Sequence, residues 1–346
     1  MIRHHSATGI AAWTDLLRML KDDAVSDILG VPRLKTVRGR GYWYDRYRLG
    51  TEVVDRYIGE DTPELRARLD RQKLIADMAR ANARERARLT RVLRAEGYLM
   101  ADAQTGQAVS ALARVGVFRL GGTLVGTHAF RLYEGWLGGR LGFDQAAMTD
   151  DIDIASFERL SLALGDTVEE PLPGLFAQLK FEPLPSLEKN RTWRWRQTDR
   201  STLVEFLTPS FEADEGIRDL PALGVSAQSL HFLNYLIAEP IKAPLLYRSG
   251  VLVQVPRPER FAIHKLIVAD RRREGSDSLK ARKDRAQAAF LVAVLAEDRP
   301  DDLADAWEDA MGQGPAWRSR IESTLARMHE TRARLSGLKV RGGWCG

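Results

Sequence analysis

One short segment constrains the fold of this chain more than any other: Thr-Asp-Asp-Ile-Asp-Ile at residues 149–154, in which acidic and apolar residues alternate. Alternation with a period of two is typical of a β-strand that turns one face to the core. Ile152 and Ile154 are expected to face the core, so Asp151 and Asp153 project together from the other face. Two carboxylates held one strand pitch apart suit Mg²⁺, which proteins bind through one or two carboxylates, water and substrate phosphates.

A strand, a glycine turn and a helix are predicted upstream of this segment. The apolar residues 124–125 are followed by Gly126 and Thr127, and apolar residues recur at helical spacing over 129–137. The N-terminus of a helix offers unpaired N–H groups and a positive dipole end to an anion. A glycine also lets a phosphate approach the backbone closely. We therefore expect Gly126 and Thr127 to contact phosphate groups.

The composition is that of an ordinary globular protein. Hydrophobic residues make up 44% and charged residues 29% of 346 residues, a length that fits two domains. The single cysteine, Cys345, rules out an internal disulfide and a cysteine-based metal site. Asp15 interrupts the apolar stretch that a signal peptide would need, and the chain has no run of about 18 apolar residues for a membrane span. We expect a cytoplasmic protein without a membrane partner.

Positive charge is concentrated in the first third of the chain. Residues 1–100 contain 20 Lys and Arg against 14 Asp and Glu, whereas the remaining residues contain 32 against 33. A basic region of this kind can face a polyanion such as nucleic acid. The solvated surface of helices explains the same pattern equally well.

A β-hairpin is predicted over residues 40–59, where two β-rich runs flank a turn at 49–50. Strand alternation places Tyr42, Tyr44 and Arg46 on one face. Aromatic and guanidinium groups together can stack nucleobases. The same aromatic residues could instead pack on a neighbouring helix, and the sequence leaves both interpretations open.

Helices are predicted around this hairpin. Residues 7–30 show helical periodicity, which Pro32 ends. The tripeptide 62–64, Thr-Pro-Glu, supplies a capping hydroxyl and a first-turn proline, and predicts a long, partly exposed helix to residue 95. A further helix is expected over 105–114.

In these motifs the chain resembles the nucleotidyltransferases of the DNA polymerase β superfamily, and most closely their AbiEii branch of bacterial abortive-infection and toxin-type proteins. Residues 124–127 and 149–154 match the pattern of Gly-Thr, helix and Thr-x-Asp-Ile-Asp, with a spacing longer than in the most compact members. The strand at 202–209 resembles the third-carboxylate strand of that family, with Glu205 where Asp is commoner. The resemblance extends to two later segments, 264–269 and 282–287, which are similar to lysine-bearing helices of that branch.

The resemblance implies an α/β (α+β) fold with a short mixed sheet flanked by helices. Three regions are expected: an N-terminal helix, basic hairpin and long helix at 1–103, the nucleotidyltransferase core at 104–215 and a helical C-terminal domain at 216–346. The expected catalytic and metal-binding residues are Asp151, Asp153 and Glu205. The nucleotide-binding residues implied by the resemblance are Gly126, Thr127, Lys265 and Asp284.

The activity implied is transfer of a nucleoside monophosphate from an NTP to a hydroxyl group, with release of pyrophosphate. The expected cofactor is Mg²⁺, with two ions in the site. The acceptor stays open among an RNA end such as that of tRNA, a protein and a small molecule. An antitoxin-like protein is a further expected partner. The alternative is a core that has lost catalysis and binds nucleic acid or a partner protein, although the intact pair Asp151 and Asp153 argues against it.

Overall fold

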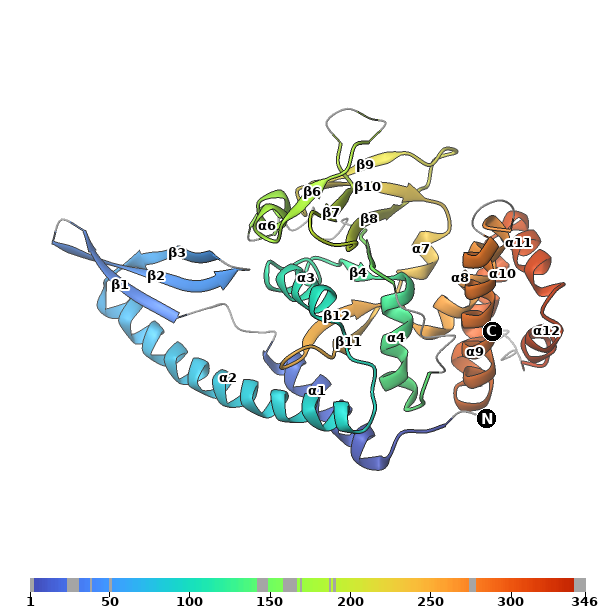
Figure 1. Ribbon diagram of the computed structural model, residues 1–346, viewed down its shortest axis with the longest axis horizontal. Coiled ribbons are helices and arrows are strands. Elements are labelled where there is room, and N and C mark those ends of the chain that lie inside the picture. The colour runs from blue at the N-terminus through green and yellow to red at the C-terminus, as the bar shows by residue number, and fades with distance from the viewer. Residues whose placement is uncertain are drawn as a thin grey trace, which may run out of the picture.

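The computed structural model describes residues 3–23, 31–37, 39–49, 52–141, 149–157, 167–168, 170–186, 188, 191–273 and 278–338. An N-terminal arm of strands and one long helix projects from a body in which helices flank a mixed sheet (Figure 1). The α/β fold expected from the sequence is confirmed. Among the described helices there is no apolar stretch of the length and composition that crossing a membrane requires.

The arm contains a three-stranded antiparallel sheet in the order β1 (Val31–Val37), β2 (Arg40–Leu49) and β3 (Glu52–Glu60). The predicted hairpin is therefore part of a larger sheet. Strand β1 contains Pro32, which the sequence analysis took only as the end of a helix. Proline is tolerated near the start of β1 because β1 is an edge strand, which pairs with a neighbour on one side only.

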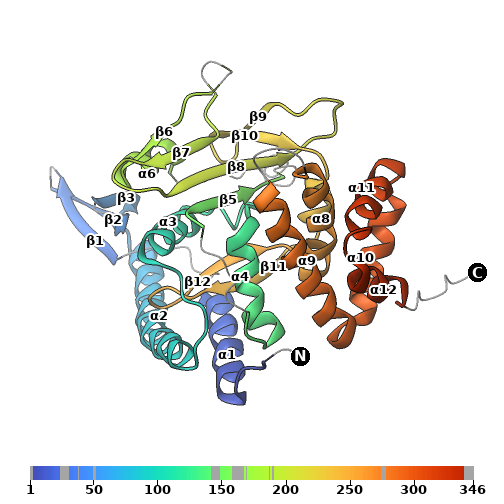
Figure 2. The same cartoon turned by 45° about the vertical axis from the view of Figure 1, so that its right-hand side comes forward.

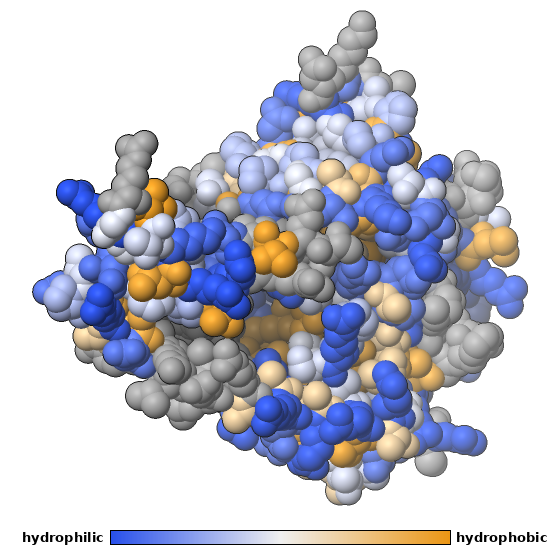
Figure 3. Space-filling view, turned by 60° about the vertical axis from the view of Figure 1, so that its left-hand side comes forward, coloured by the Kyte–Doolittle hydropathy of each residue, from blue (hydrophilic) through white to orange (hydrophobic). Residues whose placement is uncertain are grey.

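Tyr42, Tyr44 and Tyr57 lie together on one face of this sheet. The ring of Tyr57 is 5.6 Å from that of Tyr44 and 6.3 Å from that of Tyr42. Trp43 donates its indole N–H to Asp61, near the start of the long helix. Figure 3 shows hydrophilic residues interspersed with apolar ones on the surface of the arm.

Helix α2 (Pro63–Ala95) begins where the sequence predicts, because the Thr62 hydroxyl accepts the N–H of Leu65. Helix α1 (Ala7–Asp23) packs against its C-terminal half. Residues 24–30, which the sequence analysis placed in the same helix, lie outside the described residues. A separate apolar cluster joins these helices to the body, with contributions from Trp13, Leu16, Leu89, Leu93, Tyr98 and Leu246.

The central sheet of the body has β8 (Leu203–Pro209) at its centre. Strands β5 (Asp151–Ala155) and β10 (Val225–Leu230) pair with β8 in parallel. The remaining strands pair antiparallel to their neighbours and are β4 (Thr123–Leu124), β6 (Phe181–Pro183), β7 (Arg194–Gln197) and β9 (Ile217–Leu220).

The sheet continues past residue 215, where the sequence analysis expected the helical C-terminal region to begin. Strand β10 pairs with both β8 and β9, and a hairpin of β11 (Ile241–Leu245) and β12 (Val251–Val255) follows. The long C-terminal helices start only after this hairpin. They are α8 (Pro258–Arg271), α9 (Ser278–Asp298), α10 (Pro300–Gly312), α11 (Pro315–Leu325) and α12 (His329–Ser336).

The other helices of the body are α3 (Ala103–Arg114), α4 (Gly126–Leu137), α6 (Leu172–Gln178) and α7 (Leu233–Leu236). Helix α3 starts two residues before the predicted position because Asp102 caps it, accepting the N–H groups of Gln104 and Thr105. Figure 2 shows the sheet above α4 and the β11–β12 hairpin, with the C-terminal helices along one side.

Aromatic packing fixes α4 against α8, which is the contact that positions the site. The ring of Phe261 in α8 lies 6.1 Å from that of Phe130 and 5.3 Å from that of Tyr133, both in α4. All three side chains are almost completely buried. Because α4 follows β4 directly, this packing holds the polar face of α8 near the glycine turn.

Candidate active site

A cavity of about 350 Å³ is bounded by β5, β8, the start of α4 and the helices α8 and α9. Every site residue expected from the sequence lines it: Gly126, Thr127, Asp151, Asp153, Glu205, Lys265 and Asp284. These residues come from segments spread over more than 150 positions, so folding brings residues that are distant in the sequence to one cavity.

The carboxylates lie on neighbouring parallel strands. Asp153 of β5 is directly opposite Glu205 of β8. Ile152 and Ile154 are fully buried on the other face of β5, as the alternation predicts, while Asp151 is exposed at the start of the strand. One face of β5 thus anchors the strand in the core and the other presents both aspartates to the cavity.

Burial and mutual repulsion perturb this carboxylate group. Burial, followed by the charge of Asp151, raises the pKa of Asp153. Burial, followed by the charge of Asp153, raises the pKa of Glu205 to about 7. Carboxylates held this close favour a shared proton or a bound cation, either of which removes the repulsion.

The donor set fits Mg²⁺. Among the described residues, no three His, Cys, Asp or Glu side chains converge as they would around a bound ion. Magnesium does not need such a group, because one or two carboxylates with water and substrate phosphates complete its octahedron. Asp151, Asp153 and Glu205 supply hard oxygen atoms beside one cavity, where burial and the neighbouring carboxylates raise the pKa of Asp153 and of Glu205.

Gly126 is required by the position of the Asp153 carboxylate. Its φ of +67° lies in the left-handed region, and a Cβ atom at this position would be 2.3 Å from Oδ2 of Asp153. The N–H of Val125 donates to the Asp153 carbonyl at 2.9 Å, which ties the turn to β5. The glycine therefore lets a carboxylate approach the first turn of α4, in addition to the phosphate approach expected from the sequence.

Lys265 and Asp284 form a buried ion pair. Nζ of Lys265 lies 2.5 Å from Oδ1 of Asp284, and the Arg272 guanidinium donates to Oδ2 at 2.9 Å. Burial alone would favour the neutral acid, yet Lys265 and Arg272 together hold the pKa of Asp284 below its usual value. Asp284 of α9 thus contacts two cations, Lys265 in α8 and Arg272 directly after α8. Its charge partly neutralises that of Lys265.

The sequence analysis missed a second lysine in this wall. Nζ of Lys283 donates to Oγ1 of Thr127 at 2.9 Å, at the N-terminus of α4. Lys280 lines the same cavity one helical turn away. The signal was present in the sequence, because Lys283 lies within the segment 282–287 and residues three apart share a helix face.

Comparison with known families agrees with this arrangement. Residues 14–67 match a domain of unknown function (DUF6788). No curated protein is significantly similar to the chain in sequence. Residues 103–312, more than half of the chain, match a family model described as nucleotidyltransferase. This match starts at α3 and ends with α10, so it contains every residue of the cavity.

The resemblance to nucleotidyltransferases in general is thereby confirmed, while the likeness to the AbiEii branch stays a prediction. With carboxylates on adjacent strands, a glycine turn before a helix and a matched region that includes them all, the chain belongs to the nucleotidyltransferase family.

Proposed function

We propose that this protein is a Mg²⁺-dependent nucleotidyltransferase that transfers a nucleoside monophosphate from an NTP to an acceptor hydroxyl and releases pyrophosphate. One observation carries the proposal: a single cavity has the carboxylates Asp151, Asp153 and Glu205 on one wall and lysines of α9 on another. A nucleoside triphosphate with its metal ions needs both kinds of wall, carboxylates for the ions and cations for the phosphates.

Asp151 and Asp153 would hold Mg²⁺ in this proposal, with Glu205 completing the ligands of a second ion. When bound, the metal supplies charge neutralisation at the phosphate oxygens. Glu205 lies beside Asp153 at the cavity wall, where it could instead accept the proton of the attacking hydroxyl. The fixed positions of both strands in the sheet keep these oxygens oriented before substrate arrives.

The phosphate side of the site is built from α4 and α9. Gly126 and Thr127 begin α4, whose N-terminal N–H groups and dipole favour a phosphate. Lys283 is held at this helix end by its hydrogen bond to Thr127, and its charge would bind the triphosphate. Lys265 contributes less charge to the phosphates, because Asp284 pairs with it and partly neutralises it. Asp284 acts as a positioning residue for this lysine.

Transfer can be tested by incubating the protein with each α-³²P-labelled NTP, Mg²⁺ and cellular RNA or lysate. Wild type is compared with Asp151→Asn and Asp153→Asn. Asp150→Asn is the matched control, since Asp150 is the neighbouring acid but is exposed and lies outside the lining of the cavity. We expect label on one class of acceptor with wild type and the control, and none with either site variant.

Acceptor identity follows from where the label appears: an RNA end such as that of tRNA, a protein hydroxyl or a small molecule. Mg²⁺-dependent nucleotide binding, measured by calorimetry with a non-hydrolysable NTP, gives a readout that needs no acceptor. Absence of both label and nucleotide binding would refute the proposal and favour a non-catalytic module that binds nucleic acid or a partner protein. Copurification of a stable antitoxin-like protein tests the remaining expected partner.

A further inference from the structure

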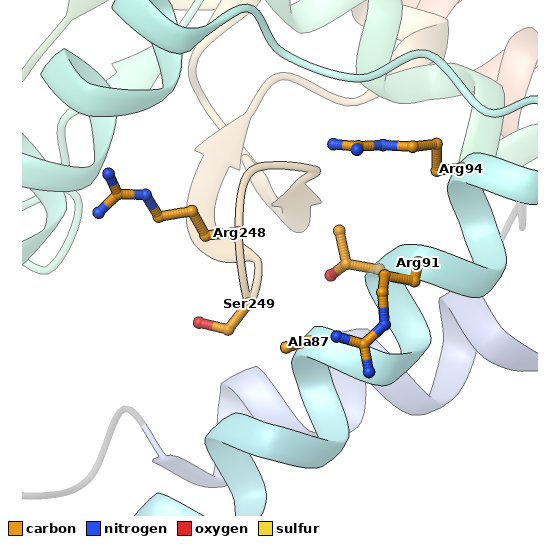
Figure 4. A pocket seen from close by; sticks show the side chains of 6 residues that line it. Ala87, Arg91, Arg94, Arg248 and Ser249 are labelled. Carbon is orange, nitrogen blue, oxygen red and sulfur yellow. The ribbon is translucent and has the colours of Figure 1, made fainter.

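A second cavity of about 350 Å³ lies between α2 and the turn that joins β11 to β12 (Figure 4). It shares no lining residue with the candidate active site. Helix α2 contributes one wall, and the turn contributes the other. The lining residues are Ala87, Thr90, Arg91, Arg94, Arg248 and Ser249.

The charge of this cavity is positive and uncompensated. Arg91, Arg94 and Arg248 are all exposed, and within the described part of the chain none of them forms an ion pair. By contrast, Arg88 in the same helix pairs with Glu85. Arg91 and Arg94 are three residues apart and so share a face of α2, and Figure 4 shows Arg94 reaching from the helix toward the turn.

The walls are held in place by specific contacts. Nε of Arg86 donates to the carbonyl of Ser249 at 3.3 Å and joins α2 to the turn. The Tyr247 ring packs directly on Gly106 of α3, where an added Cβ would be 2.2 Å from the ring. Arg248 has a left-handed φ of +52° and its guanidinium lies 5.1 Å from the centre of the Tyr247 ring. A ligand would therefore meet arginines whose backbone is already positioned.

Arg248 also borders a third cavity, of about 190 Å³, on the α3 side of the turn. The side chain of Arg248 points toward this side in Figure 4, away from α2. Tyr247 adds an aromatic ring to the lining. Adjacent cavities that share an arginine form a track longer than one phosphate group. The other residues of the third cavity are Gln107, Ser110, Ala111, Arg114 and Leu179.

We propose that this track, the Arg91–Arg94–Arg248 site, binds the phosphate backbone of a single-stranded nucleic acid. Guanidinium groups match phosphate oxygens in geometry and charge. Single strands are bound by positive grooves that follow the backbone. The Tyr247 ring lies under the Arg248 guanidinium and supports it in this groove. The cavity between α2 and the turn has no exposed aromatic or large aliphatic anchor of the kind that fixes a protein partner. The proposal rests on this site alone and does not depend on transferase activity.

The test is fluorescence anisotropy of a labelled single-stranded RNA of mixed sequence, titrated with full-length protein without Mg²⁺ or NTP. The variant replaces Arg91, Arg94 and Arg248 with alanine. A matched control removes the same charge from exposed arginines of the C-terminal helices and the turn between them, namely Arg318, Arg327 and Arg332. Melting temperatures confirm that both proteins fold.

Each phosphate contact with a single strand contributes about 0.7 to the slope of log affinity against log salt. With one contact per arginine, the variant is expected to lose about 2 from this slope and on the order of 100-fold in affinity at about 0.1 M salt. The control should change neither quantity appreciably. Because the titration contains neither Mg²⁺ nor NTP, its outcome does not depend on nucleotidyl transfer, so a failure of this proposal is distinguishable from a failure of the proposed activity.

Equal affinity and equal slope for the variant and the control would overturn the proposal. A parallel titration with inorganic tripolyphosphate distinguishes a free polyphosphate from a nucleic-acid backbone. Tripolyphosphate binding as tight as that of the RNA, and lost in the same variant, would overturn the nucleic-acid assignment. Competition by an acidic peptide at matched charge, as strong as that by RNA, would favour a protein partner and would overturn it too.

Discussion

The substitution Gly126→Ala tests whether the Asp153 carboxylate must lie against the first turn of α4. A Cβ atom would be 2.3 Å from Oδ2 of Asp153, whereas ordinary contact begins near 3.4 Å. The carboxylate or the turn must therefore move by about 1 Å, a displacement that can cost on the order of 100-fold in rate at a catalytic group. The left-handed φ of +67° adds about 1–2 kcal/mol of strain to the folded state.

Gly224→Ala is the matched control for this substitution. Gly224 has nearly the same φ, +65°, but an added Cβ would contact nothing within 4 Å. Both variants should lose about 1–2 kcal/mol of unfolding free energy, or roughly 2–8 °C in Tm. Only Gly126→Ala should also lose Mg²⁺-dependent nucleotide binding and transfer, measured by calorimetry and by label incorporation. If Gly126→Ala binds and transfers like the Gly224 control, the proposed contact between glycine and carboxylate has no functional role.

Further predictions concern the cations and the remaining carboxylate. Asp284→Ala leaves Lys265 and Arg272 without their buried partner and should lower the unfolding free energy by about 3–5 kcal/mol in denaturant titration; a loss below about 1 kcal/mol would show that the pair is solvated. Lys283→Met should weaken NTP binding by about 10-fold while leaving the Tm within about 2 °C, since it removes a charged hydrogen bond near the phosphates; unchanged NTP affinity would exclude this lysine from the phosphate site. Folding raises the pKa of Glu205 from 4.5 to about 7, so the folded state favours the neutral acid. The stability that this carboxyl group contributes is therefore fully present below its unfolded pKa and is lost as the pH rises through about 7. In metal-free buffer, Glu205→Gln should therefore gain Tm relative to wild type between about pH 5 and about pH 8, and a difference independent of pH would contradict this.

Local patterns in the sequence were sufficient for the elements with strong periodicity or caps. Strand β5 follows from the alternation of Asp and Ile, and α2 follows from the capping threonine and first-turn proline. Strand β1 could not be predicted in this way, because a proline in a short run of mixed polarity is compatible with a strand only if that strand lies at a sheet edge. Edge position is a property of the assembled sheet.

The extent of the central sheet was another property that local patterns did not reveal. Residues 217–230 alternate weakly, and their strands are defined by pairing of β10 with both β8 and β9. The sequence analysis therefore expected helices too early in the chain. These strands form because partners far apart in the sequence pair with them. Ladder hydrogen bonds and burial stabilise a strand whose own composition has only a weak preference for that conformation.

By itself the sequence determined which polar groups are candidates for the site: two aspartates on one face of an anchored strand, a glycine turn before a helix, and lysines on later helices. Only the tertiary structure decided which of these groups are available. It placed Asp153 opposite Glu205, committed Lys265 to Asp284, and brought Lys283 to Thr127 across 156 residues. The physical reason is that periodicity is local, whereas burial, ion pairing and the resulting pKa of a group depend on neighbours that only folding supplies.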